Sequence, residues 1–168
     1  MSFSRLFDPL SNVAGANIVH NIAMPAGEYG LIHGSIIFCA FLGHPYFWGS
    51  CRIGSEDSKP DLDQKDFLDR NGLFVSPYGI DDPKNNPMGP NAPSLAGLGC
   101  TRVLVSVAAN DILRDRGRLY CDELRKSGWK GEVELFEVDG ENHAFHIFDP
   151  DCENAVVFKH LASFLNHP

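Results

Sequence analysis

The spacing of hydrophobic residues along the chain predicts three β-strands. The runs Ser35–Phe41 and Arg102–Ala108 are almost wholly apolar and rich in β-branched and aromatic residues. This composition is typical of strands that are buried on both faces. A third run, Glu132–Val138, is also predicted to be a strand. The three runs together indicate a buried sheet.

Three further segments carry apolar residues at helical spacing and are predicted to be α-helices. Their apolar stripes comprise Ile18, Val19, Ile22 and Ala23 in 14–26, Leu119, Tyr120 and Leu124 in 115–127, and Val157, Phe158, Leu161, Phe164 and Leu165 in 153–166. Gly27 is expected to cap the first helix in the left-handed conformation, and Gly128 is expected to end the second.

The order of these elements predicts an α/β fold. Strands separated by helices pair in parallel through right-handed crossovers, so we expect a parallel sheet of three to four strands flanked by helices. Between the first two strands, Gly43–Gly99 holds most of the eleven prolines and is expected to be a long excursion with one helix near Asp61–Arg70. Such excursions are more often functional than accidental. The whole chain, residues 1–168, is expected to be one domain.

Composition and charge narrow the classes of partner. The formal net charge is −8 and no Lys/Arg cluster is present, which disfavours nucleic acid and anionic membranes as partners. No stretch approaches the roughly 18 uninterrupted apolar residues of a membrane span, and no secretory leader is recognised. The five widely spaced cysteines suit neither a disulfide framework nor a zinc site. A soluble, cytoplasmic protein with reduced thiols is expected.

Candidate chemistry follows the second and third predicted strands. Asp111 lies three residues past one strand and His143 five past the next, and ligands of parallel sheets bind at the carboxyl ends of the strands. A carboxylate that orients an imidazole is suited to general-base catalysis. The alternative is that Asp111 caps the following helix and His143 is an ordinary loop histidine.

A hydrolase site would also need a nucleophile on a tight G-x-S-x-G turn between a strand and a helix. The corresponding turn is Ser11–Gly15, which has Val13 where the serine belongs.

The chain resembles plant carboxylesterases of the hormone-sensitive-lipase-like branch of the α/β-hydrolases, a family that also contains the gibberellin receptors. The motifs that carry the resemblance are AGANI (Ala14–Ile18), HPYFWGS (His44–Ser50), NPMGPNAPSLAGLGCTRVLVSVA (Asn86–Ala108), DILRDRGRLYCDELRKSGW (Asp111–Trp129) and GENHAFHIFDP (Gly140–Pro150). They cover nearly the whole chain. The resemblance implies a partial α/β-hydrolase fold, with Asp111 as the acid and His143 as the base of a Ser-His-Asp triad.

Two departures from the family bear on activity. Val13 occupies the place of the nucleophile, and the altered segment follows a run, Phe3–Phe7, that resembles the family's strand before the turn. The family's N-terminal half, with its H-G-G-G oxyanion loop, has no counterpart, so Ala14 N–H is the expected remainder of the oxyanion hole. Ser11 lies two residues before the nucleophile position and is not expected to substitute, because its hydroxyl should not face His143.

Three functional hypotheses remain open at this point. The first is a carboxylesterase-family hydrolase with little or no activity. The second is a non-catalytic protein that binds a small ester or a hormone-like ligand. The third is a truncated product that self-associates through an exposed sheet edge.

No cofactor and no metal are predicted. His143 and His146 lack a third ligand, and His20 is expected to be packed or solvated. HPYFW is expected to be a packed corner that shapes the pocket rather than a cation site.

Overall fold

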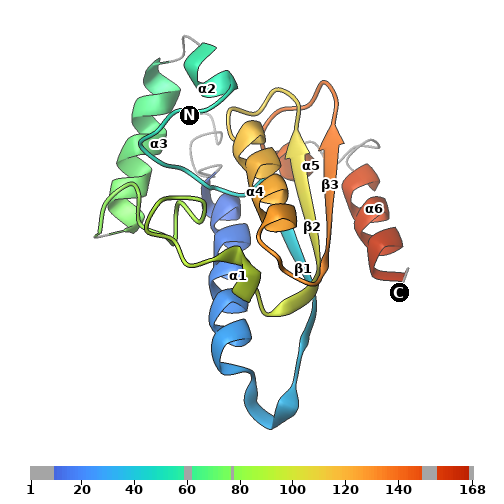
Figure 1. Cartoon of the computed structure of the whole chain (residues 1–168). Coiled ribbons are helices and arrows are strands. Elements are labelled where there is room, and N and C mark those ends of the chain that lie inside the picture. The colour runs from blue at the N-terminus through green and yellow to red at the C-terminus, as the bar shows by residue number, and fades with distance from the viewer. Residues whose placement is uncertain (1–9, 59–61, 77, 149–154, 167–168) are drawn as a thin grey trace.

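A computed structural model describes residues 10–58, 62–76, 78–148 and 155–166. Its centre is a parallel sheet of β1 (Ile37–Gly43), β2 (Cys100–Ala108) and β3 (Glu132–Val138), in that order. Gly43 is paired with Ser106, and Ala108 with Val138, so the strands end close to one another. In Figure 1 the arrowheads of β2 and β3 point to the same end of the molecule. The predicted α/β fold with a parallel sheet is confirmed.

The two faces of the sheet are covered by different helices. Helices α1 (Leu10–Tyr29) and α4 (Arg114–Lys126) pack on one face, where their buried side chains join those of Leu42, Val105 and Val107. The other face packs against α5 (Phe145–Phe148) and α6 (Ala155–Asn166), through Phe145 and Val157. Figure 1 shows α4 in front of the strands and α6 to their side. No helix among these described residues is both long enough and apolar enough to cross a bilayer.

The burial prediction is right for β2 and wrong for β1. Eight of the nine β2 residues are buried, whereas the β1 residues alternate between buried and partly exposed positions. Phe38 is 48% exposed, and Ile36 just before the strand is 75% exposed. The reason is that, among the described residues, β1 has only β2 as a neighbour and therefore forms an edge. The segment Phe3–Phe7, predicted to be a strand, lies outside the described residues.

Helix α1 buries a different face from the one predicted. Ile18 and Ile22 are more than half exposed, whereas Asn17, His20 and Ala23 are buried. The buried polar side chains are tolerated because they have partners. Asn17 Nδ2 donates to the Tyr46 carbonyl over 2.7 Å, and His20 Nδ1 lies 3.1 Å from the Tyr120 hydroxyl oxygen. The position of this helix is therefore set by polar contacts as well as by apolar burial.

Glycine positions correct the predicted end of α1. The helix continues past Gly27 to Tyr29, and the left-handed glycine is Gly30, with φ of 72°. Gly27 instead allows close backbone contact: a Cβ there would lie 1.9 Å from the Gly97 carbonyl oxygen. The Gly99 N–H donates to the Ala23 carbonyl beside this contact. At the end of α4, Gly128 has φ of 90°, as a helix stop requires.

The proline-rich excursion is ordered by buried polar contacts. It contains α2 (Ser55–Ser58), the predicted helix α3 (Leu62–Val75) and a 3₁₀ turn at Leu95–Gly97. A second 3₁₀ turn, Ile32–Gly34, precedes β1. The Arg116 guanidinium of α4 binds the fully buried Glu56 carboxylate at 2.6 Å. Trp48, also fully buried, has the Arg52 guanidinium 4.6 Å above its ring. The aromatic residues Phe47 and Trp48 of HPYFW are therefore packed, as predicted.

Substituting alanine at two glycines of α1 should give opposite effects. In Gly27→Ala the new methyl group meets the backbone of Gly97 and Gly99, so the free energy of unfolding should fall by about 1–3 kcal/mol. Gly15→Ala is the matched control, because nothing lies within 4 Å of its Cβ position. Helix propensity should then raise the free energy of unfolding by up to about 1 kcal/mol. Urea denaturation measures both, and equal effects would contradict the close approach.

Buried His20 should make stability depend on pH. Burial lowers its pKa to about 4, below the value of about 6.5 in an unfolded chain. The unfolded chain therefore binds a proton more readily, so this stabilisation is complete above pH 6.5 and is lost as the pH falls toward 4. Between pH 7 and pH 5 the contribution of His20 should fall by about 2 kcal/mol.

Urea denaturation of the parent chain and of His20→Gln at the two pH values measures this difference. Gln keeps polar atoms for Tyr120 but does not titrate, so the variant should lose about 2 kcal/mol less than the parent. His146 is present in both proteins and cancels in the comparison. Equal losses in the two proteins would show that His20 is not the titrating group.

Candidate functional site

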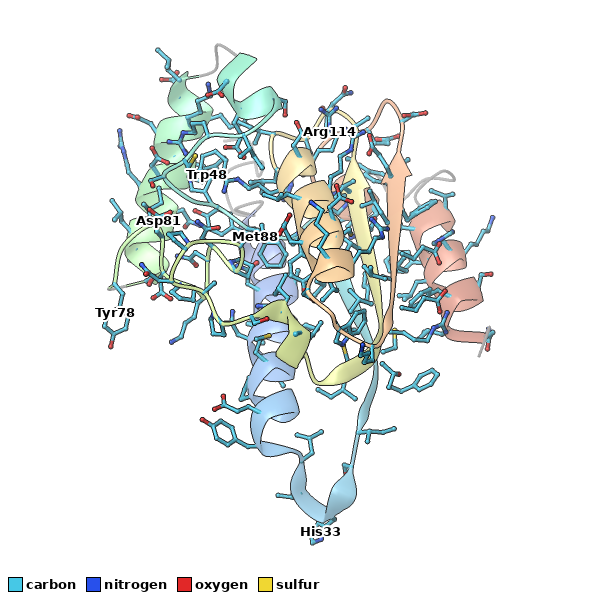
Figure 2. All side chains as sticks on the ribbon, viewed as in Figure 1. His33, Trp48, Tyr78, Asp81, Met88 and Arg114 are labelled. Carbon is cyan, nitrogen blue, oxygen red and sulfur yellow. The ribbon has the colours of Figure 1, made fainter. Side chains whose placement is uncertain are left out.

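Each of the three strands delivers one ionisable side chain to the same edge of the sheet. His44 follows the last residue of β1 directly, Asp111 lies three residues past β2, and His143 lies five past β3. Because the strands are parallel and end in register, these side chains converge at their carboxyl ends. In Figure 2 this edge is near Arg114, and His33 marks the opposite end of the molecule.

Asp111 and His143, the two residues predicted as acid and base, are in contact. His143 Nδ1 lies 2.5 Å from Asp111 Oδ2, in position to donate its proton. The other carboxylate oxygen, Oδ1, accepts the Leu113 backbone N–H over 2.9 Å. Asp111 is therefore not the cap of α4, whose N-cap is Leu113 without a side-chain cap, and its Oδ1 instead closes a turn just before the helix. Both bonds fix the carboxylate in one orientation.

Asp111 is held in its ionised form by its surroundings. The side chain is nearly fully buried, and burial by itself would raise its pKa. The hydrogen bond from His143, the nearby His44 imidazole and the Leu113 N–H outweigh burial and hold the pKa of Asp111 below its usual range. An ionised carboxylate in this position can orient an imidazole and stabilise its protonated form.

His143 presents an unused nitrogen to the site. Its Nδ1 is occupied by Asp111, whereas its Nε2 is buried and has no hydrogen-bond partner among the described residues. A general base needs this arrangement, with one nitrogen fixed by a carboxylate and the other left to take a proton. The geometry supports acid–base chemistry at Nε2.

His44 is a member of the cluster that the sequence analysis did not identify. Its Nδ1 lies 3.7 Å from Asp111 Oδ2, and both of its ring nitrogens are buried without hydrogen-bond partners. The backbone of His44 has φ of 47°, and Ala144, beside His143, has φ of 56°. Left-handed non-glycine residues are strained and gather at functional sites. The signal was available, because His44 lies three residues past the end of the predicted strand Ser35–Phe41.

A third imidazole adjoins the cluster. The His146 ring stacks on that of His44 at a centroid distance of 5.0 Å. Burial, together with His44 and His143, lowers the pKa of His146 to about 4. His146 is therefore a neutral wall of the site at neutral pH.

The nucleophile segment does not form the expected turn. Residues 11–15 lie inside α1, which begins at Leu10, whereas the prediction placed a tight turn there and began the helix at Ala14. A G-x-S-x-G turn needs glycines for its strained backbone, and this segment has Ser11 in place of the first of them. In a regular helix the fifth N–H, that of Ala14, is used within the helix. Ala14 as an oxyanion donor stays a prediction.

A groove of about 590 Å³ lies elsewhere, between α1 and the excursion, with Met24, Tyr78 and Pro93 among its lining residues. None of its lining residues belongs to the imidazole cluster. Figure 2 shows Tyr78 on the outer side of the excursion.

Comparison with known proteins identifies relatives of the chain. Residues 12–147 match the family described as the alpha/beta hydrolase fold. The chain is 43% identical over 158 residues to probable carboxylesterase 2 of Arabidopsis thaliana, covering 91% of this chain and 48% of that protein. It is 46% identical over 153 residues to the chloroplastic tuliposide A-converting enzyme 1 of Tulipa gesneriana, covering 89% of this chain and 38% of the relative. The chain thus spans less than half the length of these relatives.

Solved structures agree on the fold. A hyperthermophilic esterase from the archaeon Pyrobaculum calidifontis superposes with a TM-score of 0.72 at 24% identity, covering 89% of this chain and 48% of the esterase. At that identity the likeness shows the fold and nothing finer.

The short bond between Asp111 and His143 should be visible by proton NMR. A carboxylate acceptor at 2.5 Å deshields the imidazole proton, so the Nδ1–H of His143 should resonate far downfield of the backbone amides. Asp111→Asn should remove this signal, and His146→Gln, which leaves the bond intact, should retain it. A downfield signal that survives in Asp111→Asn would contradict the assigned contact.

Proposed function

Because this chain belongs to the α/β-hydrolase fold family, we propose that its imidazole cluster is the acid–base part of a carboxylic ester hydrolase site. We further propose that the chain as written has little or no esterase activity. Asp111 is the acid and His143 is the base. The observation that carries the proposal is the hydrogen bond between them, which leaves His143 Nε2 free to accept a proton. The similarity to plant carboxylesterases supports the same chemistry.

The low activity follows from the position of the nucleophile. Val13 stands where the family has serine, and valine has no hydroxyl to be acylated. Removing the nucleophile of a serine hydrolase costs on the order of 10⁶ in turnover. What remains after such a loss is roughly 10³–10⁴-fold over water, from the oxyanion hole and binding. With Ala14 inside α1, even this residual contribution is expected to be reduced.

A small-molecule binding role is the second candidate. The groove of about 590 Å³ beside α1 has the size of a typical ligand pocket, and binding there needs no nucleophile. A hormone-like molecule or an uncleaved ester is the expected ligand class.

The exposed Ile36 and Phe38 at the β1 edge favour self-association. The predicted cytoplasmic location is part of this proposal, although relatives are named chloroplastic and mitochondrial.

Hydrolysis of p-nitrophenyl butyrate by the purified chain tests the proposal. The parent chain and His143→Ala should give the same rate, because a base without a nucleophile cannot form an acyl-enzyme intermediate. The rate should lie on the order of 10⁶ below that of an intact serine esterase.

Ser11→Ala is the matched control for a substitute nucleophile. Robust turnover that His143→Ala abolishes and Ser11→Ala retains would show an active site with another nucleophile. Loss in both variants would identify Ser11 as that nucleophile. An ester that raises the melting temperature without being cleaved would favour the binding role.

A further inference from the structure

We propose that His44, Asp111 and His143 form a binding site for a first-row divalent metal ion such as Zn²⁺ or Co²⁺. One ligand atom from each residue lies within 4.8 Å of the other two. Two imidazoles and one carboxylate are a donor set that such metals take from proteins. The proposal does not rest on the esterase chemistry, since a triad has no use for His44.

The distances lie close to those of a metal site. Metal bonds of about 2.0–2.2 Å place neighbouring ligand atoms of a tetrahedral ion roughly 3.3 Å apart. His44 Nδ1 and His143 Nδ1 lie 3.7 Å and 2.5 Å from Asp111 Oδ2. Both distances from Asp111 therefore differ from the required one by less than about 1 Å, and all three ligand atoms lie within 4.8 Å of one another. Rotation of the side chains would close the site around an ion.

Besides the distances, the buried side chain of His44 points to a bound ligand. It is 2% exposed, and neither of its ring nitrogens has a hydrogen-bond partner among the described residues. Buried polar atoms without partners are costly and rare, so each calls for a reason. The strained backbone at φ of 47° and the hydrogen bond from His44 N–H to the Ser106 carbonyl hold the ring against Asp111. A metal ion would give one of these nitrogens the partner that it lacks.

Metal binding and the imidazole–carboxylate bond are alternatives at the same atoms. When the ion binds, His143 changes tautomer: Nδ1 loses its proton to solvent and becomes the ligand atom, and Nε2 takes up a proton from solvent. Asp111 Oδ2 then becomes a ligand instead of an acceptor. Asp111 Oδ1 still accepts the Leu113 N–H, so the carboxylate keeps the second contact that fixes metal ligands in position. Three protein ligands leave further positions of the ion open for water or another small ligand.

Titration with CoCl₂ tests this site in the purified full chain, freed of metal with a chelator and kept reduced. Visible absorption should saturate at one Co²⁺ per chain and should lack the thiolate charge-transfer band that cysteine ligands give. His44→Gln and Asp111→Asn should each weaken binding at least about tenfold. His33→Gln should bind like the parent, because His33 lies at the opposite end of the molecule. ZnCl₂ should raise the melting temperature of the parent and of His33→Gln by several degrees.

Circular dichroism and a cooperative melt establish that each variant folds. If His44→Gln does not fold, His143→Gln takes its place, because His143 is the least buried member of the cluster, and it should show the same loss. A parent chain without a saturable Co²⁺ spectrum would overturn the proposal. A thiolate band, or equal affinity in His44→Gln, Asp111→Asn and His33→Gln, would do so as well, since the ion would then bind elsewhere.

Discussion

Parallel pairing of β1, β2 and β3 brings the carboxyl ends of all three strands to one edge of the sheet, and the site depends on this pairing. Each strand is followed within five residues by a histidine or an aspartate, namely His44, Asp111 and His143. Antiparallel pairing of any strand would have sent its residue to the opposite end. The site is thus a consequence of strand direction, and the sequence separation of its members has no bearing on their contact.

The surroundings of this edge keep it buried and ordered. The excursion after β1 packs its HPYFW corner against α1 through Asn17 and Tyr46. It is also joined to α4 by the buried pair of Arg116 and Glu56. These polar contacts hold the strained His44 beside Asp111. Because burial excludes water, the electrostatic interaction between the carboxylate and the imidazoles is stronger than it would be at the surface. Both proposed roles of the cluster, as an acid–base pair and, with His44, as a metal site, depend on these contacts of the Asp111 carboxylate.

The conformation of residues 11–15, the nucleophile segment, does not decide whether the rest of the fold forms. The strands, the helices and the Asp111–His143 bond all form, although residues 11–15 lie within helix α1 and do not make a tight turn. The sheet does not need that turn, because its stability comes from burial of residues such as Val105 and Leu124. The contact between Asp111 and His143 is therefore independent of whether residues 11–15 form a tight turn.

The sequence by itself determined the α/β class, the bounds of β3 and nearly those of β2. It also predicted that Asp111 and His143 could reach one sheet edge, because periodicity and strand order are local signals, but it left helix capping by Asp111 as an alternative. It did not determine that β1 forms an edge, that α1 buries Asn17 and His20, or that Gly27 serves backbone contact rather than a helix cap. Only the tertiary structure decided these features and the place of His44, because each depends on which elements pack together.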